Sequence, residues 1–193
     1  MNKASVYGVD FLMPMIYAAD MTEPLPTTKD SLLHVLDSLG TAYNIHEHDP
    51  IFTVEEGEHL KASIPGEHCR NLFLRDKKKN MFLVVAANRT KIDLKKLSSV
   101  LDCGRLSFGS SDRLWQYLGI RQGSVNPFCI MNDTEKVVRI ILDQYMMEQK
   151  IVNYHPMDNA FTIGLSPADL SSFIEHVDHI PEIVDLTLAA PDP

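Results

Sequence analysis

Local capping signals and the spacing of apolar residues mark five helical stretches in this chain. Thr27 or Thr28 caps the first, in which leucine and valine recur at intervals of three and four residues, and Gly40 follows it. A capping box of Thr53 and Glu56 opens the second. The pattern predicts helices over residues 27–39, 53–62, 93–101, 110–118 and 166–177.

Short apolar runs bounded by polar, glycine or proline residues indicate strands between these helices. A polar connector of hairpin length, residues 76–80, joins two of them. Strands outnumber helices and their order is irregular, which favours an α+β or mixed α/β sheet flanked by helices. The expected strands cover residues 42–48, 71–75, 81–86, 105–108, 128–131, 137–142, 151–155, 160–163 and 181–186.

Composition narrows the class of protein. The chain has 193 residues, 45% of them hydrophobic, which suits one globular domain. Its net charge of -8 argues against non-specific coating of nucleic acid, but it leaves room for a local basic patch. The three cysteines are sparse and form no C-x-x-C motif, so we expect a reducing cytoplasm. No apolar run approaches the roughly 18 residues of a membrane helix.

The chain is predicted to divide into an arm, one domain and a short tail. Residues 1–26 form the arm, and Asp10 and Pro14 interrupt its apolar stretch, which argues against a signal peptide. Residues 27–188 form a single domain with no internal repeat or linker. Residues 189–193 are expected to fray.

Two polar clusters raise chemical hypotheses that have simpler structural explanations. His46 and His48 share one face of the predicted strand, so two imidazoles could meet one metal ion, but no third ligand is evident. A polar strand end is the favoured interpretation. Cys69 follows His68, but adjacent strand residues point to opposite faces, so a buried, unactivated thiol is favoured over a nucleophile.

Three further features could serve a ligand. Lys77, Lys78 and Lys79, with Arg75 before them, form the tip of the predicted hairpin, either a solvated turn or a phosphate-facing patch. The segment from Gly123 to Pro127 could expose backbone N–H groups. His155 ends a predicted strand and precedes a proline.

Several stretches taken together resemble one family. They are Phe52-Thr53-Val54-Glu55-Glu56, Arg70-Asn71-Leu72-Phe73-Leu74-Arg75-Asp76-Lys77-Lys78, Gly123-Ser124-Val125-Asn126-Pro127, Asn153-Tyr154-His155-Pro156 and Pro181-Glu182-Ile183-Val184-Asp185-Leu186. Their order and spacing resemble the YbaK/ProX family of trans-editing aminoacyl-tRNA deacylases, most of all the free-standing prolyl-tRNA editing proteins. The resemblance covers residues 27–186 and implies a mixed, largely antiparallel sheet surrounded by helices.

The resemblance also implies an activity and a set of site residues. The activity is hydrolysis of the ester in mischarged tRNA(Pro), typically alanyl-tRNA(Pro), without a metal or other cofactor. The partners it implies are the tRNA and prolyl-tRNA synthetase, but neither DNA nor a membrane. The implied catalytic residues are Arg70, Asn71 and His155; the implied substrate-binding residues are Phe52, Thr53, Gly123, Ser124 and Pro127; the basic residues Arg75, Lys77, Lys78 and Lys79 would bind tRNA.

One position departs from the family pattern. Arg70 stands where the family usually has lysine, and an arginine cannot act as a general base because it stays protonated. It can still hold a phosphate or a carbonyl through two N–H groups. Two alternatives to a deacylase therefore stay open: a non-catalytic module that binds tRNA or a synthetase, and a metal-dependent hydrolase built on His46 and His48. The oligomeric state is also left open.

Overall fold

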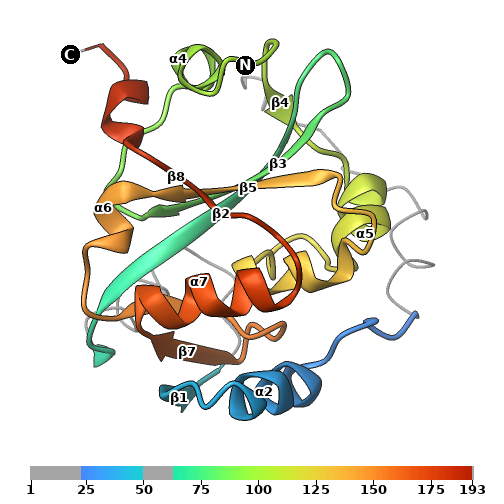
Figure 1. Cartoon of the computed structure of the whole chain (residues 1–193), viewed down its shortest axis with the longest axis vertical. Helices are drawn as coiled ribbons and strands as arrows, with labels where there is room; N and C mark the ends of the chain where they lie inside the picture. The colour runs from blue at the N-terminus through green and yellow to red at the C-terminus, as the bar shows by residue number, and fades with distance from the viewer. Residues whose placement is uncertain (1–22, 50–62, 193) are drawn as a thin grey trace, which may run out of the picture.

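The structure is a computed structural model that describes residues 23–49 and 63–192. Within them, one mixed sheet of eight strands runs through the molecule (Figure 1). The path of the sheet is β1-β7-β6-β2-β3-β5-β8, and β4 pairs with β2 beside it. The strands are β1 (Tyr43–Glu47), β2 (Glu67–Arg75), β3 (Met81–Ala87), β4 (Ser107–Phe108), β5 (Val138–Asp143), β6 (Val152–Tyr154), β7 (Phe161–Leu165) and β8 (Glu182–Val184).

The sheet contains both parallel and antiparallel pairs. The pairs β1–β7, β6–β7, β2–β3 and β2–β4 are antiparallel, whereas β2–β6, β3–β5 and β5–β8 are parallel. The mixed sheet that the sequence predicts is therefore confirmed. The helices around it are α2 (Lys29–Ser38), α4 (Leu94–Val100), α5 (Ser111–Leu118), α6 (Gln144–Met147) and α7 (Pro167–His176), with 3-10 helices η1 (Pro127–Asn132) and η2 (Leu186–Ala189).

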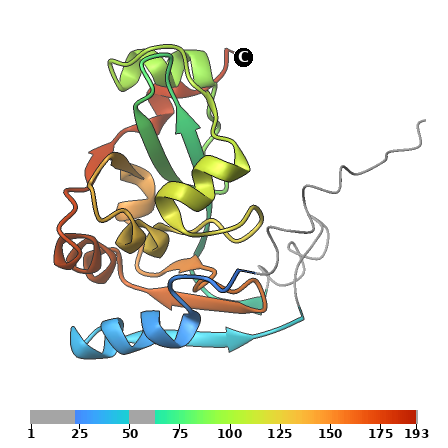
Figure 2. The ribbon, with the colours of Figure 1, turned by 90° about the vertical axis from the view of Figure 1, so that its right-hand side faces the viewer.

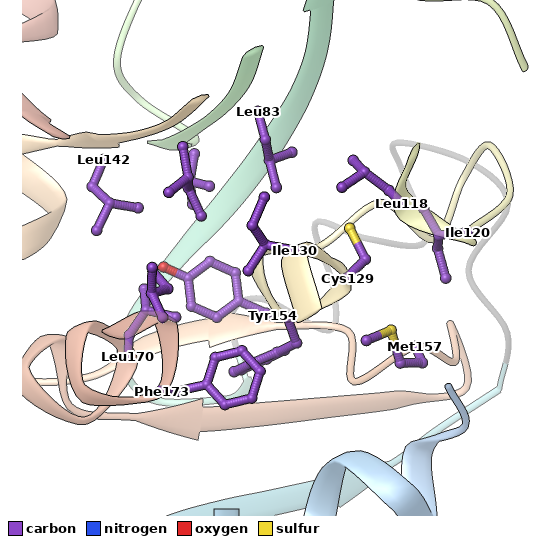
Figure 3. Packing of buried hydrophobic residues seen from close by; sticks show 14 of the residues in the cluster. Leu83, Leu118, Ile120, Cys129, Ile130, Leu142, Tyr154, Met157, Leu170 and Phe173 are labelled. Carbon is purple, nitrogen blue, oxygen red and sulfur yellow. The ribbon is translucent and has the colours of Figure 1, made fainter. Parts of the chain in front are cut away.

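Strand β3 lies at the centre of the sheet and is buried on both faces, as its unbroken apolar sequence predicts. Alternate residues contribute to two separate cores. Leu83 and Val85 belong to a large core with residues of α2, α5, η1 and α7, while Phe82 and Val84 belong to a smaller one with α4 and η2. The large core surrounds η1 (Figure 3). The two ends of the long axis carry α4 and α2 (Figures 1 and 2).

Local signals place most helix ends as expected. Thr28 caps α2 in a capping box with Ser31, and Gly40 adopts a φ of +69° just beyond its end. Ser110 caps α5, and Ser166 caps α7 with Pro167 in the first turn. The predicted helix over 53–62 lies outside the described residues.

One predicted strand is wrong. Residues 128–131 form part of the 3-10 helix η1, because Asn126 caps it by accepting a hydrogen bond from the Cys129 N–H and Pro127 occupies its first turn. Phe128, Cys129 and Ile130 are all buried, so this short apolar run carries no periodicity that separates helix from strand. The sequence analysis also missed the short helix α6, which Asp143 caps.

The C-terminal end of the described chain is more ordered than the sequence predicts. Ala189 is fully buried in the smaller core, and its carbonyl accepts a hydrogen bond from the Asp93 N–H. Lys96 Nζ lies 2.6 Å from a carboxylate oxygen of Asp192. The packed chain therefore continues past residue 188, the predicted end of the domain.

Candidate active site

Asn71 connects the centre of β2 to the glycine-containing loop. Its Nδ2 donates a hydrogen bond to the Val125 carbonyl at 2.9 Å. Its Oδ1 is buried and accepts no hydrogen bond from the described residues. The unengaged atom of Asn71 is therefore an acceptor, which suits a ligand hydroxyl or ammonium group rather than a carbonyl.

The loop from Gly123 to Pro127 is held by internal contacts and by the segment after β6. Asn126 is fully buried; its Nδ2 donates to the Ser124 carbonyl at 2.8 Å and contacts Met157 Sδ at 3.4 Å. Gly123 adopts a φ of +88° with open space where a side chain would begin. The N–H groups of Gly123 and Val125 donate to no acceptor within the described chain. The loop is thus anchored and still offers backbone donors.

His155 follows the end of β6, which pairs in parallel with the start of β2 through Glu67 with Val152 and His68 with Asn153. The Met157 N–H donates to the His155 carbonyl at 3.0 Å. Met157 therefore contacts both the backbone of His155 and Asn126 of the loop.

The hydrogen bonds of His155 determine its tautomer. Nδ1 lies 2.8 Å from the Phe161 carbonyl, which can only accept, so Nδ1 carries the proton. Burial lowers the pKa of His155 below 6.5; the Phe161 bond opposes this shift, and His48 adds to it. At neutral pH the ring is therefore uncharged, and Nε2 presents a lone pair that no described residue engages.

Arg70 lies on the other face of the sheet. Along β2, Cys69 and Phe73 pack into the large core, whereas Leu72 and Leu74 pack into the smaller one. Arg70 alternates with Asn71 and so shares the side of Leu72 and Leu74. Its Nη2 donates to the Thr90 carbonyl, and its Nε is buried without a partner among the described residues. Asn71 and Arg70 thus have different partners: Asn71 bonds to the Gly123–Pro127 loop, and Arg70 bonds to Thr90.

The basic hairpin is exposed at its tip and built around a buried carboxylate. Asp76 accepts hydrogen bonds from the backbone N–H and the side-chain amide of Asn80, both at 2.9 Å. These bonds lower the pKa of Asp76 despite its burial. Lys77, Lys78 and Lys79 are exposed beyond it, at the end of β2 away from its pairing with β6. Phe52 and Thr53 lie outside the described residues.

The two alternative chemistries find little support in this geometry. Desolvation raises the pKa of the partly buried Cys69 thiol to about 12, and a thiol at that pKa is not a nucleophile at neutral pH. Within residues 23–49 and 63–192, no group of three or more His, Cys, Asp or Glu side chains could hold a metal ion. In that same part of the chain, no helix is long and apolar enough to cross a membrane.

Comparison with known proteins assigns the class. Residues 48–173 match the family model of the aminoacyl-tRNA editing domain. The chain belongs to this family, the YbaK/ProX editing domains. It is 38% identical over 148 residues to the prolyl-tRNA editing protein ProX of Acetoanaerobium sticklandii, a match that covers 76% of this chain and 90% of that protein.

Two other proteins extend the comparison. The prolyl-tRNA synthetase associated domain-containing protein 1 of Danio rerio is 36% identical over 140 residues, which is 72% of this chain and 76% of that protein. A crystal structure assigned as a trans-editing enzyme for prolyl tRNA synthetase superposes with a TM-score of 0.63 over 82% of this chain and 96% of that chain. Its sequence identity of 15% shows the shared fold alone.

Sequence reasoning missed two features around this site. It considered His48 as part of a polar strand end or as a metal ligand, whereas His48 contacts the ring of His155. It also treated Arg70 and Asn71 as one pair, although the alternation of side chains along a strand was a signal that they face opposite ways.

Proposed function

We propose that this protein is a trans-acting deacylase that hydrolyses the ester of mischarged tRNA(Pro), with alanyl-tRNA(Pro) as its substrate. The observation that carries the proposal is the Asn71–Val125 hydrogen bond, because it fixes a loop in which the N–H groups of Gly123 and Val125 remain free. Membership of the editing family and the 38% identity to a prolyl-tRNA editing protein support the substrate class.

The chemistry asks for few groups. Water attacks the ester carbonyl carbon, a C–O bond forms, and the bond to the ribose oxygen breaks. The proton lost by water ends on the ribose oxygen, which leaves free amino acid and tRNA. The N–H groups of Gly123 and Val125 would stabilise the negative charge on the carbonyl oxygen. His155 Nε2 would orient the water or the substrate, and Asn71 Oδ1 would accept from a ribose hydroxyl or the α-ammonium group.

Editing in trans has a thermodynamic reason. A synthetase pocket shaped for proline rejects alanine weakly, because each missing methylene changes binding by only about 1–3 kcal/mol. A second, smaller pocket can accept alanine and exclude proline by steric overlap. This protein would be that second pocket, and its exposed hairpin lysines would attract the phosphates of one tRNA end. Association with prolyl-tRNA synthetase stays a prediction from the family resemblance.

The test is a deacylation panel with the purified full chain. Alanyl-, prolyl-, seryl- and cysteinyl-tRNA(Pro) are incubated with the wild type, with His155→Ala and with His34→Ala, a control on the exposed face of α2. We expect release of alanine above the buffer rate in the wild type and control, and a large loss in His155→Ala. Release no faster than buffer across the panel would reject the enzyme and favour the binding module.

A further inference from the structure

A hollow lies among the segments that follow β3, β5 and β8. It has a volume of about 390 Å³ and lies where the parallel strands β3 and β5 end. Figure 1 shows α6 and, above it, the red C-terminal turn η2 on the same side of the molecule. Its walls are Arg89, Thr90, Lys91, Tyr145, Thr187 and Ala190. None of them belongs to the candidate active site.

Thr90 fixes one wall of this hollow. Its N–H donates to the Ala87 carbonyl at 3.0 Å, and its Oγ1 bonds to an oxygen of Asp143 at 2.5 Å. Its carbonyl accepts from Arg70 Nη2. Both polar backbone groups and the hydroxyl of Thr90 are therefore occupied, so the backbone that carries Arg89 and Lys91 is held in place before a ligand arrives.

Arg89 lies over the Tyr145 ring and also bonds to its hydroxyl. Arg89 Nη1 donates to the Tyr145 hydroxyl at 2.7 Å, and its guanidinium carbon lies 5.4 Å from the centre of the Tyr145 ring. Nucleic-acid bases stack on aromatic rings and on guanidinium planes. The Ala190 methyl group and the Tyr145 ring give the rest of the wall an apolar character.

Lys91 supplies an uncommitted positive charge. It is exposed and makes no hydrogen bond or ion pair with another described residue, in contrast to Lys96, which pairs with Asp192. The acidic groups nearby are already engaged. Asp143 accepts from Thr90, Ala87 and Tyr145, and Glu67 lies 3.5 Å from the Tyr145 hydroxyl. Lys91 and the outer N–H groups of Arg89 can therefore meet an anion.

We propose that this hollow, the Arg89–Lys91 pocket, binds a nucleotide, with the phosphate at Lys91 and Arg89 and the base against the apolar wall. The volume falls within the roughly 300–1,000 Å³ of small-molecule sites. The nucleotide is either free in solution or a unit of an RNA strand. Arg70 is then a positioning residue for this pocket, because it holds Thr90. The inference does not rest on the deacylase activity.

Binding of small probes to the full chain tests the proposal without any catalytic assay. AMP, adenosine, inorganic phosphate and the dinucleotide ApA are titrated separately by NMR, with the amide signals of Thr90, Lys91 and Thr187 as readout. We expect AMP to bind more tightly than either adenosine or phosphate, because AMP alone contacts both the cationic residues and the apolar wall of the pocket. ApA binding as tightly as AMP indicates an RNA strand as the source, and AMP binding alone indicates a free nucleotide.

Two variants make the test specific. We expect Lys91→Gln to weaken AMP binding by about tenfold, the value of one charge-assisted contact. Lys136→Gln is the matched control, since Lys136 precedes β5 at the end of the strand away from Tyr145. Absence of binding by both AMP and ApA overturns the proposal. So does adenosine or phosphate binding as tightly as AMP, or an equal effect of the two variants.

Discussion

His48 and His155 meet edge to face, with ring centres 5.9 Å apart and an interplanar angle of 61°. Both nitrogens of His48 are engaged: Nδ1 lies 2.9 Å from the Asp49 carbonyl and Nε2 lies 3.0 Å from Thr162 Oγ1. Since a carbonyl only accepts, Nδ1 of His48 carries the proton. An imidazole held at both nitrogens therefore packs against the candidate catalytic histidine.

Removal of the His48 ring should raise the pKa of His155. In His48→Ala, water gains access to His155 and a neighbouring positive charge at low pH is lost, and both changes favour the protonated form. Histidine NMR titration measures the shift, with His34→Ala as the control. A pKa of His155 that stays constant or falls would contradict the role assigned to His48. In activity assays, the same variant should move the acidic limb of the pH profile to higher pH.

Asn71→Ala should reduce deacylation without unfolding the protein. The variant removes the hydrogen bond to the Val125 carbonyl and the free acceptor Oδ1, so the loop is no longer held in position to bind the substrate. Misplaced catalytic groups cost about a hundredfold in rate, and we expect a loss of that order in kcat/KM on alanyl-tRNA(Pro). Asn44→Ala, on the exposed side of β1, serves as the control. An equal rate for Asn71→Ala and the control would exclude Asn71 from the site.

Arg70 variants should separate catalysis from binding. Because Arg70 faces away from Asn71 and bonds to Thr90, we expect Arg70→Gln to raise KM for tRNA more than it lowers kcat. Arg70→Lys restores the family residue, and little change in kcat is the expected result for a working enzyme. A gain of activity from zero in Arg70→Lys would instead support a binding module that has lost catalysis. Steady-state kinetics on both variants distinguishes these two outcomes.

The buried pair of Asp133 and His179 should control stability in acid. His179 Nδ1 lies 3.1 Å from the Val177 carbonyl oxygen, and its Nε2 lies 3.1 Å from Asp133 Oδ2. The carboxylate also accepts from the N–H groups of Val137 and Val138. The His179 bond and these backbone bonds lower the pKa of Asp133 against its desolvation.

Two consequences follow for His179→Ala. It leaves a buried carboxylate with less compensation, and we expect a loss of about 3 kcal/mol in the free energy of unfolding at pH 7. A carboxyl with a depressed native pKa stabilises the fold above its unfolded pKa near 3.8, and that stability is lost as pH falls through the native pKa. In the variant, the native pKa of Asp133 rises, so acid unfolding begins at higher pH. Urea unfolding between pH 3 and 7 measures both effects, with His176→Ala as the control. Equal dependence of unfolding free energy on pH in the two variants would contradict the prediction.

Sequence patterns identified most elements because their signals are local. Thr28, Ser110 and Ser166 cap helices through bonds to residues three positions away, so the sequence alone contains both partners. The unbroken apolar run of β3 likewise predicts a strand covered on both faces. The prediction for residues 128–131 was wrong because Phe128, Cys129 and Ile130 are all buried. A continuous buried run has no periodicity that distinguishes a helix from a strand.

The family, the mixed fold and the candidate residues Asn71, Gly123 and His155 could be predicted from the sequence by itself, because each depends on residue types in a fixed order. Tertiary structure decided which of them meet. Asn71 reaches Val125 across 54 positions of the chain, and Arg70, one position away, reaches Thr90 on the opposite face. Because successive side chains of a strand point to opposite faces of the sheet, Asn71 and Arg70 lie on different faces. The pairing of β2 with β6 is a long-range contact that the sequence does not display. Only the folded sheet could therefore give Asn71 and Arg70 their different partners.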